Sequence, residues 1–255
     1  MESLEQISLK YQTDKSVLVH YLRNYEKYFA NLREQEVKLL ELGVLDGGSL
    51  LMWRDYFPNG MIAGLDINPV TIDDTTRRVR LYQGKQEDHG ILKQIADEVA
   101  PNGFDIVIDD CAHIGSLSRR SYRYLFDNHL KSGGFYVIED WGTGYWDTRP
   151  DGARYRDRVA GQEIRFPERV GYALSRALKR KPDSWFTPGI SRLKKVFVDH
   201  NSSSHNAGMV GFVKELFDEC SIADIDHPEF GSGKNRTSTI KEMMVSASHV
   251  FVVKK

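Results

Sequence analysis

Short apolar runs recur through residues 37–140 and alternate with longer amphipathic stretches. The runs occupy residues 37–42, 61–65, 79–82, 104–108 and 135–138. Their mostly uninterrupted apolar character is typical of strands buried on both faces, and most stretches between them are long enough for a crossover helix. The pattern predicts five parallel strands joined by right-handed crossovers.

The parts of the chain outside residues 37–140 predict two helices and a hairpin. Residues 14–33 carry apolar and aromatic groups at helical spacing with Asp14 as a candidate N-cap, and residues 207–219 predict a second amphipathic helix. Residues 240–245 and 249–253 predict a terminal β-hairpin. We therefore expect an α/β fold: a doubly wound, Rossmann-like, mostly parallel seven-stranded sheet with a C-terminal antiparallel hairpin and helices on both faces.

The expected layout is a single domain over residues 1–255. It comprises an N-terminal helical cap (1–36), a ligand-binding core (37–140), a lid or acceptor region (141–206) and a C-terminal helix and hairpin (207–255). The third part is rich in aromatic residues, proline and glycine, as lids often are. Within it, residues 167–181 look helical and residues 192–206 hold an ambiguous short strand. The basic stretch 176–195 fits a solvated helix face better than a surface for an anionic substrate or a membrane.

Acids follow two of the predicted strands directly: Asp109 and Asp110 after the fourth, Glu139 and Asp140 after the fifth. Ligands of open α/β sheets bind at this carboxyl edge. Clustered carboxylates repel one another unless they meet a cation, and an oxygen-rich set suits Mg²⁺, Mn²⁺ or Ca²⁺. His113 can face the same space. The alternatives are that Asp110 caps the next helix, that His113 is an ordinary loop residue, and that the other acids pair with arginines.

A glycine-bearing turn follows the first predicted strand, which ends in Glu41 and Gly43. The turn continues through Gly47 to Ser49, at the start of a helix, so the backbone can approach a ligand closely. A tight turn with Ser49 as an N-cap would explain the same pattern. Asp66 ends the next strand about twenty residues later, where an acid typically binds a ribose diol.

Composition narrows the class of partner. The net charge is −1, which gives no reason to expect nucleic acid as a partner. Two cysteines are too few for a disulfide framework, which fits a cytoplasmic protein, and no run of about 18 apolar residues predicts a transmembrane segment. A homo-oligomer is left open.

Together these motifs resemble class I S-adenosylmethionine-dependent methyltransferases. More narrowly, they look like the macrocin and mycinamicin type of metal-dependent sugar O-methyltransferase, with the cephalosporin-hydroxylase-like group as a related branch. The similarity lies in YQTDK (11–15), LLELGVLDGGSLLMW (39–53), GLDINP (64–69), FDIVIDDCAHI (104–114), LKSGGFYVIEDWGTGYW (130–146) and GMVGFVKELFDE (208–219). The family usually has Gly-Ser where this chain has Cys111-Ala112.

The resemblance assigns a role to each matched residue. It implies His113 as general base and Asp110, Glu139 and Asp140 as ligands of Mg²⁺ or Mn²⁺. It makes residues 37–140 the S-adenosylmethionine-binding core, with cofactor contacts from Thr13, Glu41, Gly43, Gly47, Ser49, Asp66, Gln86 and Asp109. The acceptor would be a small molecule or glycan with vicinal hydroxyls.

Other functions stay open on the sequence. An NAD-dependent oxidoreductase could use Asp66 for its ribose, although the turn lacks GxGxxG and no Tyr-x-x-x-Lys pair follows on a helix near the fourth strand. A cephalosporin-hydroxylase-like protein would have a non-sugar acceptor. A non-catalytic cofactor-binding protein would be expected to lose the acids or the histidine. The aromatic residues Trp141, Tyr145 and Trp146 fit sugar stacking as well as lid packing.

Overall fold

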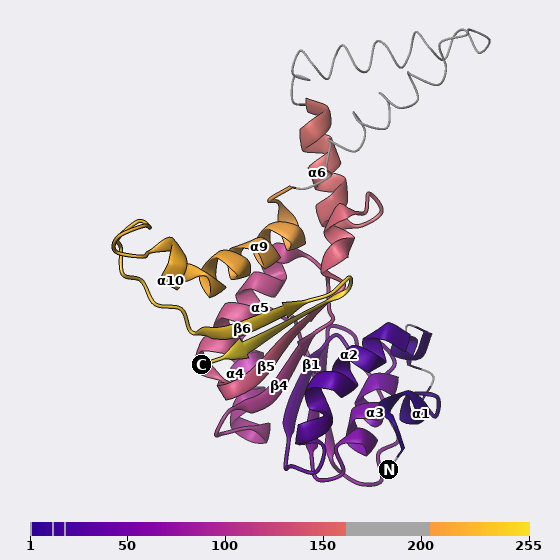
Figure 1. Cartoon of the computed structure of the whole chain (residues 1–255). Helices are drawn as coiled ribbons and strands as arrows, with labels where there is room; N and C mark the ends of the chain where they lie inside the picture. The colour runs from indigo at the N-terminus through magenta and orange to yellow at the C-terminus, as the bar shows by residue number, and fades with distance from the viewer. Residues whose placement is uncertain (1, 12, 18, 162–204) are drawn as a thin grey trace, which may run out of the picture.

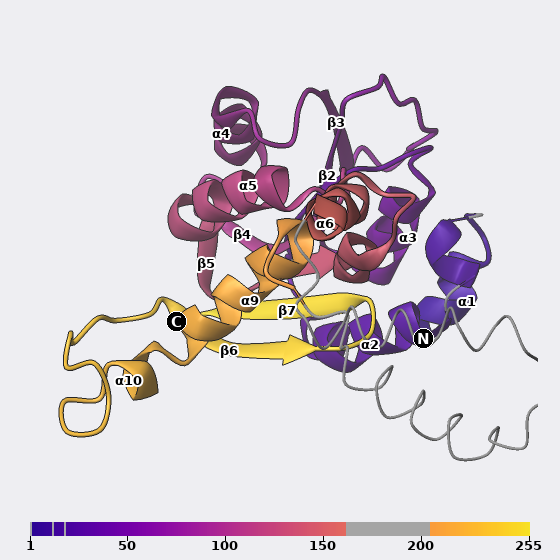
Figure 2. The same cartoon turned by 90° about the horizontal axis from the view of Figure 1, so that it is seen from above.

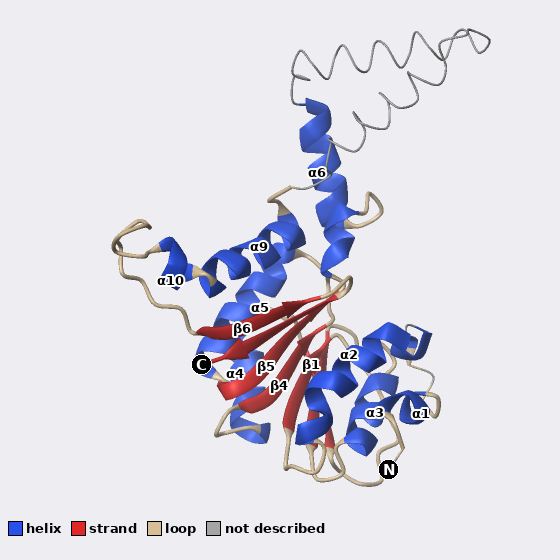
Figure 3. Cartoon of the chain, viewed as in Figure 1, coloured by secondary structure: helices blue, strands red, loops and turns tan. Residues whose placement is uncertain are grey.

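A computed structural model describes residues 2–11, 13–17, 19–161 and 205–255. The described residues form a seven-stranded sheet with the order β3-β2-β1-β4-β5-β7-β6. Its strands are β1 (Lys38–Leu42), β2 (Met61–Asp66), β3 (Val79–Gln83), β4 (Phe104–Asp109), β5 (Leu130–Glu139), β6 (Ile240–Val245) and β7 (His249–Lys254). The first five are parallel, and β7 runs antiparallel to both β5 and β6. The predicted fold class is confirmed (Figure 3).

Helices cover both faces of the sheet (Figures 1 and 2). One face packs against α4 (His89–Val99), α5 (Gly115–Asn128) and α9 (Gly208–Cys220), and the other against α1 (Leu4–Ser8), α2 (Val19–Phe29) and α3 (Gly48–Tyr56). Each face has its own apolar core, with Tyr122 and Phe212 in the first and Tyr25 and Trp53 in the second. Burial of these large side chains on both faces holds the sheet as the middle layer of three.

The N-terminal helix is less regular than the pattern predicts. Residues 14–33 form a 3₁₀ turn η1 (Asp14–Val17), then α2, then a second 3₁₀ turn η2 (Ala30–Leu32), with residue 18 outside the described ranges. Asp14 therefore opens η1 and does not cap α2. The reason is local: the hydroxyl of Thr13 accepts from the backbone N–H of Lys15, and the turn that results directs Lys15 toward the sheet.

Other boundaries also differ from expectation. Residues 130–134, which precede the apolar run at 135–138, also belong to β5, where a register shift against β4 and the positive φ of Gly133 (77°) accommodate the irregularity. The connection from β2 to β3 is a loop without a helix. Part of the expected irregular region is helical, as η3 (Trp141–Tyr145) and α6 (Pro150–Gly161), and a short α10 (Ile222–Ile225) follows α9. The expectations for residues 167–181, 176–195 and most of 192–206 lie outside the described residues.

Strand alternation decides which way each acid points. Ile106 and Ile108 pack in the core under α1–α3, whereas Val107 packs in the opposite core. Successive side chains of a strand alternate, so Asp110 continues toward the α1–α3 face and Asp109 toward α5. By the same alternation along β1 and β5, the side chains of Glu41 and Glu139 point to the same face of the sheet as that of Asp110. No described helix is long and apolar enough to cross a membrane.

Candidate functional site

A pocket of about 600 Å³ opens at the carboxyl edge of the parallel strands. Its size is in the range of small-molecule and cofactor sites. Several residues singled out from the sequence line it together: Thr13, Gly43, Ser49, Asp66, Gln86, Asp110, His113 and Asp140. Four others lie outside this lining, namely Glu41, Gly47, Asp109 and Glu139.

The glycine turn forms one wall of the pocket. Gly43 has φ 82°, and a Cβ there would lie 2.2 Å from the carbonyl oxygen of Asp110, so no larger residue fits. Gly47, at φ 86°, is the N-cap of α3, and the Ser49 hydroxyl instead donates to Glu41 at 2.8 Å. The alternative that Ser49 caps this helix is therefore wrong. The N-cap position has a left-handed backbone conformation, which favours glycine, and Gly47 occupies it.

Asp66 stabilises this turn from the neighbouring strand. One of its carboxylate oxygens accepts from the backbone N–H groups of Val44, at 3.0 Å, and Leu45, at 3.3 Å. The other accepts from the backbone of Asn68 at 2.8 Å. The carboxylate thus lines the pocket and also fixes its glycine wall.

A buried polar network lies beneath the pocket on the α5 side. The Gln86 amide donates to Asp109 at 3.1 Å, and its oxygen accepts from the backbone N–H of Ala112 at 3.2 Å. Tyr136 donates to the other oxygen of Asp109 at 3.3 Å. Burial raises the pKa of Asp109 to about 6, although its hydrogen-bond donors lower it. Burial also raises the pKa of Cys111 to about 12. This network holds the loop that carries His113, and Cys111 is a poor candidate nucleophile.

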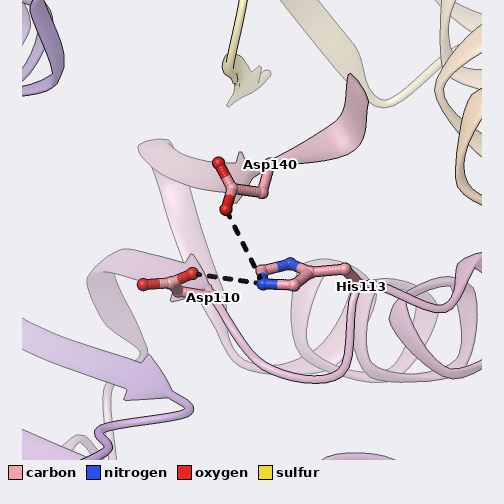
Figure 4. A group of neighbouring side chains, drawn as sticks. All are labelled: Asp110, His113 and Asp140. Carbon is pink, nitrogen blue, oxygen red and sulfur yellow. Dashed lines mark ion pairs between the residues drawn. The ribbon is translucent and has the colours of Figure 1, made fainter. Parts of the chain in front are cut away.

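Figure 4 shows His113 between two carboxylates. Its Nε2 lies 3.8 Å from Asp110 Oδ1 and 3.8 Å from Asp140 Oδ2. Both His113 (φ 51°) and Asp140 (φ 53°) have left-handed backbone conformations, which are strained for residues other than glycine and are concentrated at functional sites. The α5 helix begins after Ile114 without a side-chain cap from Asp110, so the capping alternative for that acid is wrong.

A second acidic group lies on the α1–α3 side of Asp110 and contains a buried lysine. The Lys15 ammonium lies 2.6 Å from Asp110 Oδ2, 2.8 Å from Glu139 Oε1 and 3.4 Å from Glu41 Oε1. Burial alone would lower the pKa of Lys15, but the three carboxylates raise it well above its ordinary value. Burial, opposed by Lys15, raises the pKa of Glu41 to about 7, and burial together with Glu139 raises that of Asp110 to about 7.

The sequence reasoning missed three donors to these acids. Lys15 lies in the polar segment 11–15, and Tyr21 and Tyr25 fit the aromatic spacing of the helix expected over residues 14–33, so neither pattern pointed to these acids. The Tyr25 hydroxyl donates to Glu139, and the Tyr21 hydroxyl donates to Asp140. Four acids at one sheet edge indicated that a cation lies nearby, and the ammonium of Lys15 is one such cation. The alternative in which Glu139 and Asp140 pair with arginines is not found among the described residues.

The residues present fit a divalent cation. Ligand atoms of Asp110, His113 and Asp140 lie within 4.8 Å of one another. Those of Glu41, Asp110 and Glu139 also lie within 4.8 Å of one another, but this second group already surrounds the Lys15 ammonium. The structure thus places the predicted ligands in two groups that share Asp110. The donor set is carboxylate oxygen with one imidazole, which suits Mg²⁺ or Mn²⁺. His113 Nδ1 is buried without a hydrogen-bond partner among the described residues.

No family model matches the chain, but curated relatives do. It is 42% identical over 151 residues to mycinamicin VI 2''-O-methyltransferase of Micromonospora griseorubida, covering 56% of this chain and 37% of the relative. It is 38% identical over 161 residues to L-olivosyl-oleandolide 3-O-methyltransferase of Streptomyces antibioticus (59% and 41%). It is 31% identical over 224 residues to 8-demethyl-8-alpha-L-rhamnosyl tetracenomycin-C 2'-O-methyltransferase of Streptomyces olivaceus (80% and 56%).

A solved structure extends the similarity to the fold. The MycE methyltransferase from the mycinamycin biosynthetic pathway, in complex with Mg, SAH and mycinamycin VI, matches with a TM-score of 0.63 and 29% identity, over 99% of this chain and 54% of that chain. The chain therefore spans about half the length, or less, of these relatives. It is a relative of the macrocin- and mycinamicin-type sugar O-methyltransferases and shares the MycE-like methyltransferase fold.

Proposed function

We propose that this protein is an S-adenosylmethionine-dependent and Mg²⁺- or Mn²⁺-dependent O-methyltransferase that acts on a hydroxyl of a sugar or another vicinal diol. The observation that carries the proposal is the position of His113, whose Nε2 lies 3.8 Å from an oxygen of Asp110 and from one of Asp140 in the pocket. A base and carboxylate oxygens thus share one space beside the glycine turn. The names of two relatives include olivosyl and rhamnosyl groups, which supports a sugar acceptor.

The cofactor would occupy the pocket formed by the glycine turn. Gly43 leaves room for close approach of the backbone, and Asp66 and Gln86 line the wall where we expect the ribose and the adenine. Thr13 and Ser49 also line the pocket, while Glu41, Gly47 and Asp109 lie outside this lining and would fix the turn and the loop. S-adenosylmethionine would supply an activated methyl group there.

The divalent cation would be held by Asp110 and Asp140, with Glu139 as the third carboxylate. The chemistry it supplies is stabilisation of negative charge on the acceptor oxygen and orientation of a diol. His113 Nε2 would take the proton from the acceptor hydroxyl that receives the methyl group. Holding base and acceptor in one geometry accounts for much of the expected acceleration.

We infer the partners and the compartment from charge, cysteine content and aromatic contacts. A net charge of −1 gives no reason to expect nucleic acid as a partner, and the free thiols Cys111 and Cys220 are consistent with a cytoplasmic location. The aromatic residues Trp141 and Tyr145 contact each other, and Trp141 donates to the backbone of Ser246, so we assign them to support of the acceptor region.

Calorimetric titration of S-adenosylmethionine and, separately, NAD⁺ tests the proposal, each with Mg²⁺ and with EDTA. We expect S-adenosylmethionine to bind and NAD⁺ not to bind. Asp110→Asn should remove metal-stimulated methyl transfer and retain cofactor binding, whereas Asp66→Asn should weaken cofactor binding by tenfold or more. Binding of NAD⁺ alone, or equal loss of cofactor affinity in both variants, would refute this assignment.

A further inference from the structure

Three donors from one short segment reach the three acids proposed to hold the cation. Lys15 on η1 donates to Asp110 Oδ2 at 2.6 Å and to Glu139 Oε1 at 2.8 Å. Tyr21 and Tyr25, one turn apart on α2, donate to Asp140 Oδ1 and Glu139 Oε1. Each acid therefore has a fixed partner from residues 15–25, a part of the chain far from the acids in sequence.

The donors engage one oxygen of each acid and leave the other. Asp110 Oδ1 and Asp140 Oδ2, the oxygens that are not bonded to Lys15 or Tyr21, are those that lie 3.8 Å from His113 Nε2. Both bonds to Glu139 end on Oε1, so within the described ranges no side chain bonds to Oε2. The pattern is what orientation of metal ligands requires, because a fixed second oxygen stops the carboxylate from rotating.

Burial makes this arrangement stiff. Lys15 is 2% exposed, Tyr21 3% and Tyr25 0%, and Glu139 is 1% exposed. Tyr25 packs edge-on against Trp53 and His249, and Tyr21 packs against His249, so neither ring can swing away without disturbing the core. The two tyrosines are thus held in place by packing that does not involve the acids themselves.

The same segment also contacts the cofactor wall. Thr13 and Asp14 line the pocket, and a Cβ on Gly48 would lie 2.5 Å from the carbonyl oxygen of Tyr11. The described residues of the segment 11–25 therefore pack on the glycine turn at one end and on the acids at the other. The N-terminal cap is part of the site and not only a cover for the apolar core.

We propose that Lys15, Tyr21 and Tyr25 are positioning residues, which orient Asp110, Glu139 and Asp140 so that one oxygen of each is available to a divalent cation. The inference rests on the proposed function, because it needs the cation site that we assign there. Removing a donor should weaken cation binding although no ligand has been changed.

The test measures Mn²⁺ affinity by calorimetry and by electron paramagnetic resonance, with S-adenosylhomocysteine present, in the full chain. Tyr21→Phe and Tyr25→Phe remove only a hydroxyl, and each should weaken Mn²⁺ binding about tenfold while urea denaturation shows a folded protein. Tyr28→Phe is the matched control: Tyr28 packs on Phe251 from the same helix, its hydroxyl accepts from Lys27, and we expect no change beyond twofold.

Two further variants separate this inference from the proposed function. Asp110→Asn should abolish Mn²⁺ binding, and Lys15→Met should weaken it more than either tyrosine variant. If wild type does not bind Mn²⁺, the proposed metal site is wrong. If wild type binds and Asp110→Asn does not, but both tyrosine variants bind like wild type, the metal site stands and the positioning role of residues 15–25 is refuted.

Discussion

His249 should make the stability of this protein depend on pH in a way that one substitution can remove. It lies on β7 directly opposite Glu139 on β5, and its ring is fully buried against Tyr21 and Tyr25, with centroid distances of 4.1 Å and 4.8 Å. Burial, and after it the charge of Lys15, lowers the pKa of His249 to about 3. The folded protein therefore keeps this ring neutral where an unfolded chain would protonate it.

The sign and size of the effect follow from proton linkage. Because the unfolded state binds the extra proton, stability is lost as the pH falls below the unfolded pKa of ~6.5, and the loss continues down to the folded value. Between pH 7 and pH 5 the loss is about 2 kcal/mol. The carboxyls of Glu41 and Asp110, with pKa values raised to about 7, act in the opposite direction over this range, because the folded state then binds more protons.

A comparison of variants isolates the histidine. We expect His249→Phe, which keeps the aromatic contacts, to be about 2 kcal/mol more stable relative to wild type at pH 5 than it is at pH 7. Urea denaturation at both pH values gives the double difference. His89→Phe is the control, because His89 is exposed and stacks on Tyr124 at the surface, and we expect no double difference of this size for it. Equal pH dependence in wild type and His249→Phe would refute the reasoning.

Two further predictions concern the frame of the site. Asp151 is 5% exposed and accepts from the backbone N–H groups of Gly115 and Met209, both at 2.7 Å, so Asp151→Ala should cost about 3 kcal/mol in urea denaturation. Asp151→Asn, which keeps an acceptor, should lose less than half of this, and equal losses would contradict the role of the hydrogen bonds. Gly43→Ala should lower the free energy of unfolding by more than about 3 kcal/mol. Gly133→Ala should lower it by about 1 kcal/mol, because Gly133 has a similar φ but no atom lies within 4 Å of the new Cβ.

The positions of the acids were predictable because they depend on local sequence. A buried strand must end where its apolar run ends, so Asp110 and Asp140 had to lie at the carboxyl edge of a parallel sheet. Strand alternation also separates Asp109 from Asp110, and it gives Asp109 a buried network and Asp110 the open pocket. These conclusions need only the two-residue period of a strand.

The environment of Lys15 was not predictable in this way. Its partners Asp110 and Glu139 are 95 and 124 residues away, and a lysine in the polar segment 11–15 has the pattern of a solvated residue. Only the packing of α2 on the sheet places its ammonium among three carboxylates. The left-handed backbone of His113 and Asp140 is likewise a property of the assembled loops, since neither residue type requires it.

The sequence by itself therefore determined the α/β fold, the edge at which chemistry occurs and the residue types available there. Periodicity and strand ends are local, and each can be counted along the chain. Tertiary structure decided which oxygen of each acid is held by Lys15, Tyr21 or Tyr25 and which one faces His113. The pairing of each oxygen depends on contacts between segments that meet only when helices cover both faces of the sheet. The free energy of burying those segments therefore fixes the pairing.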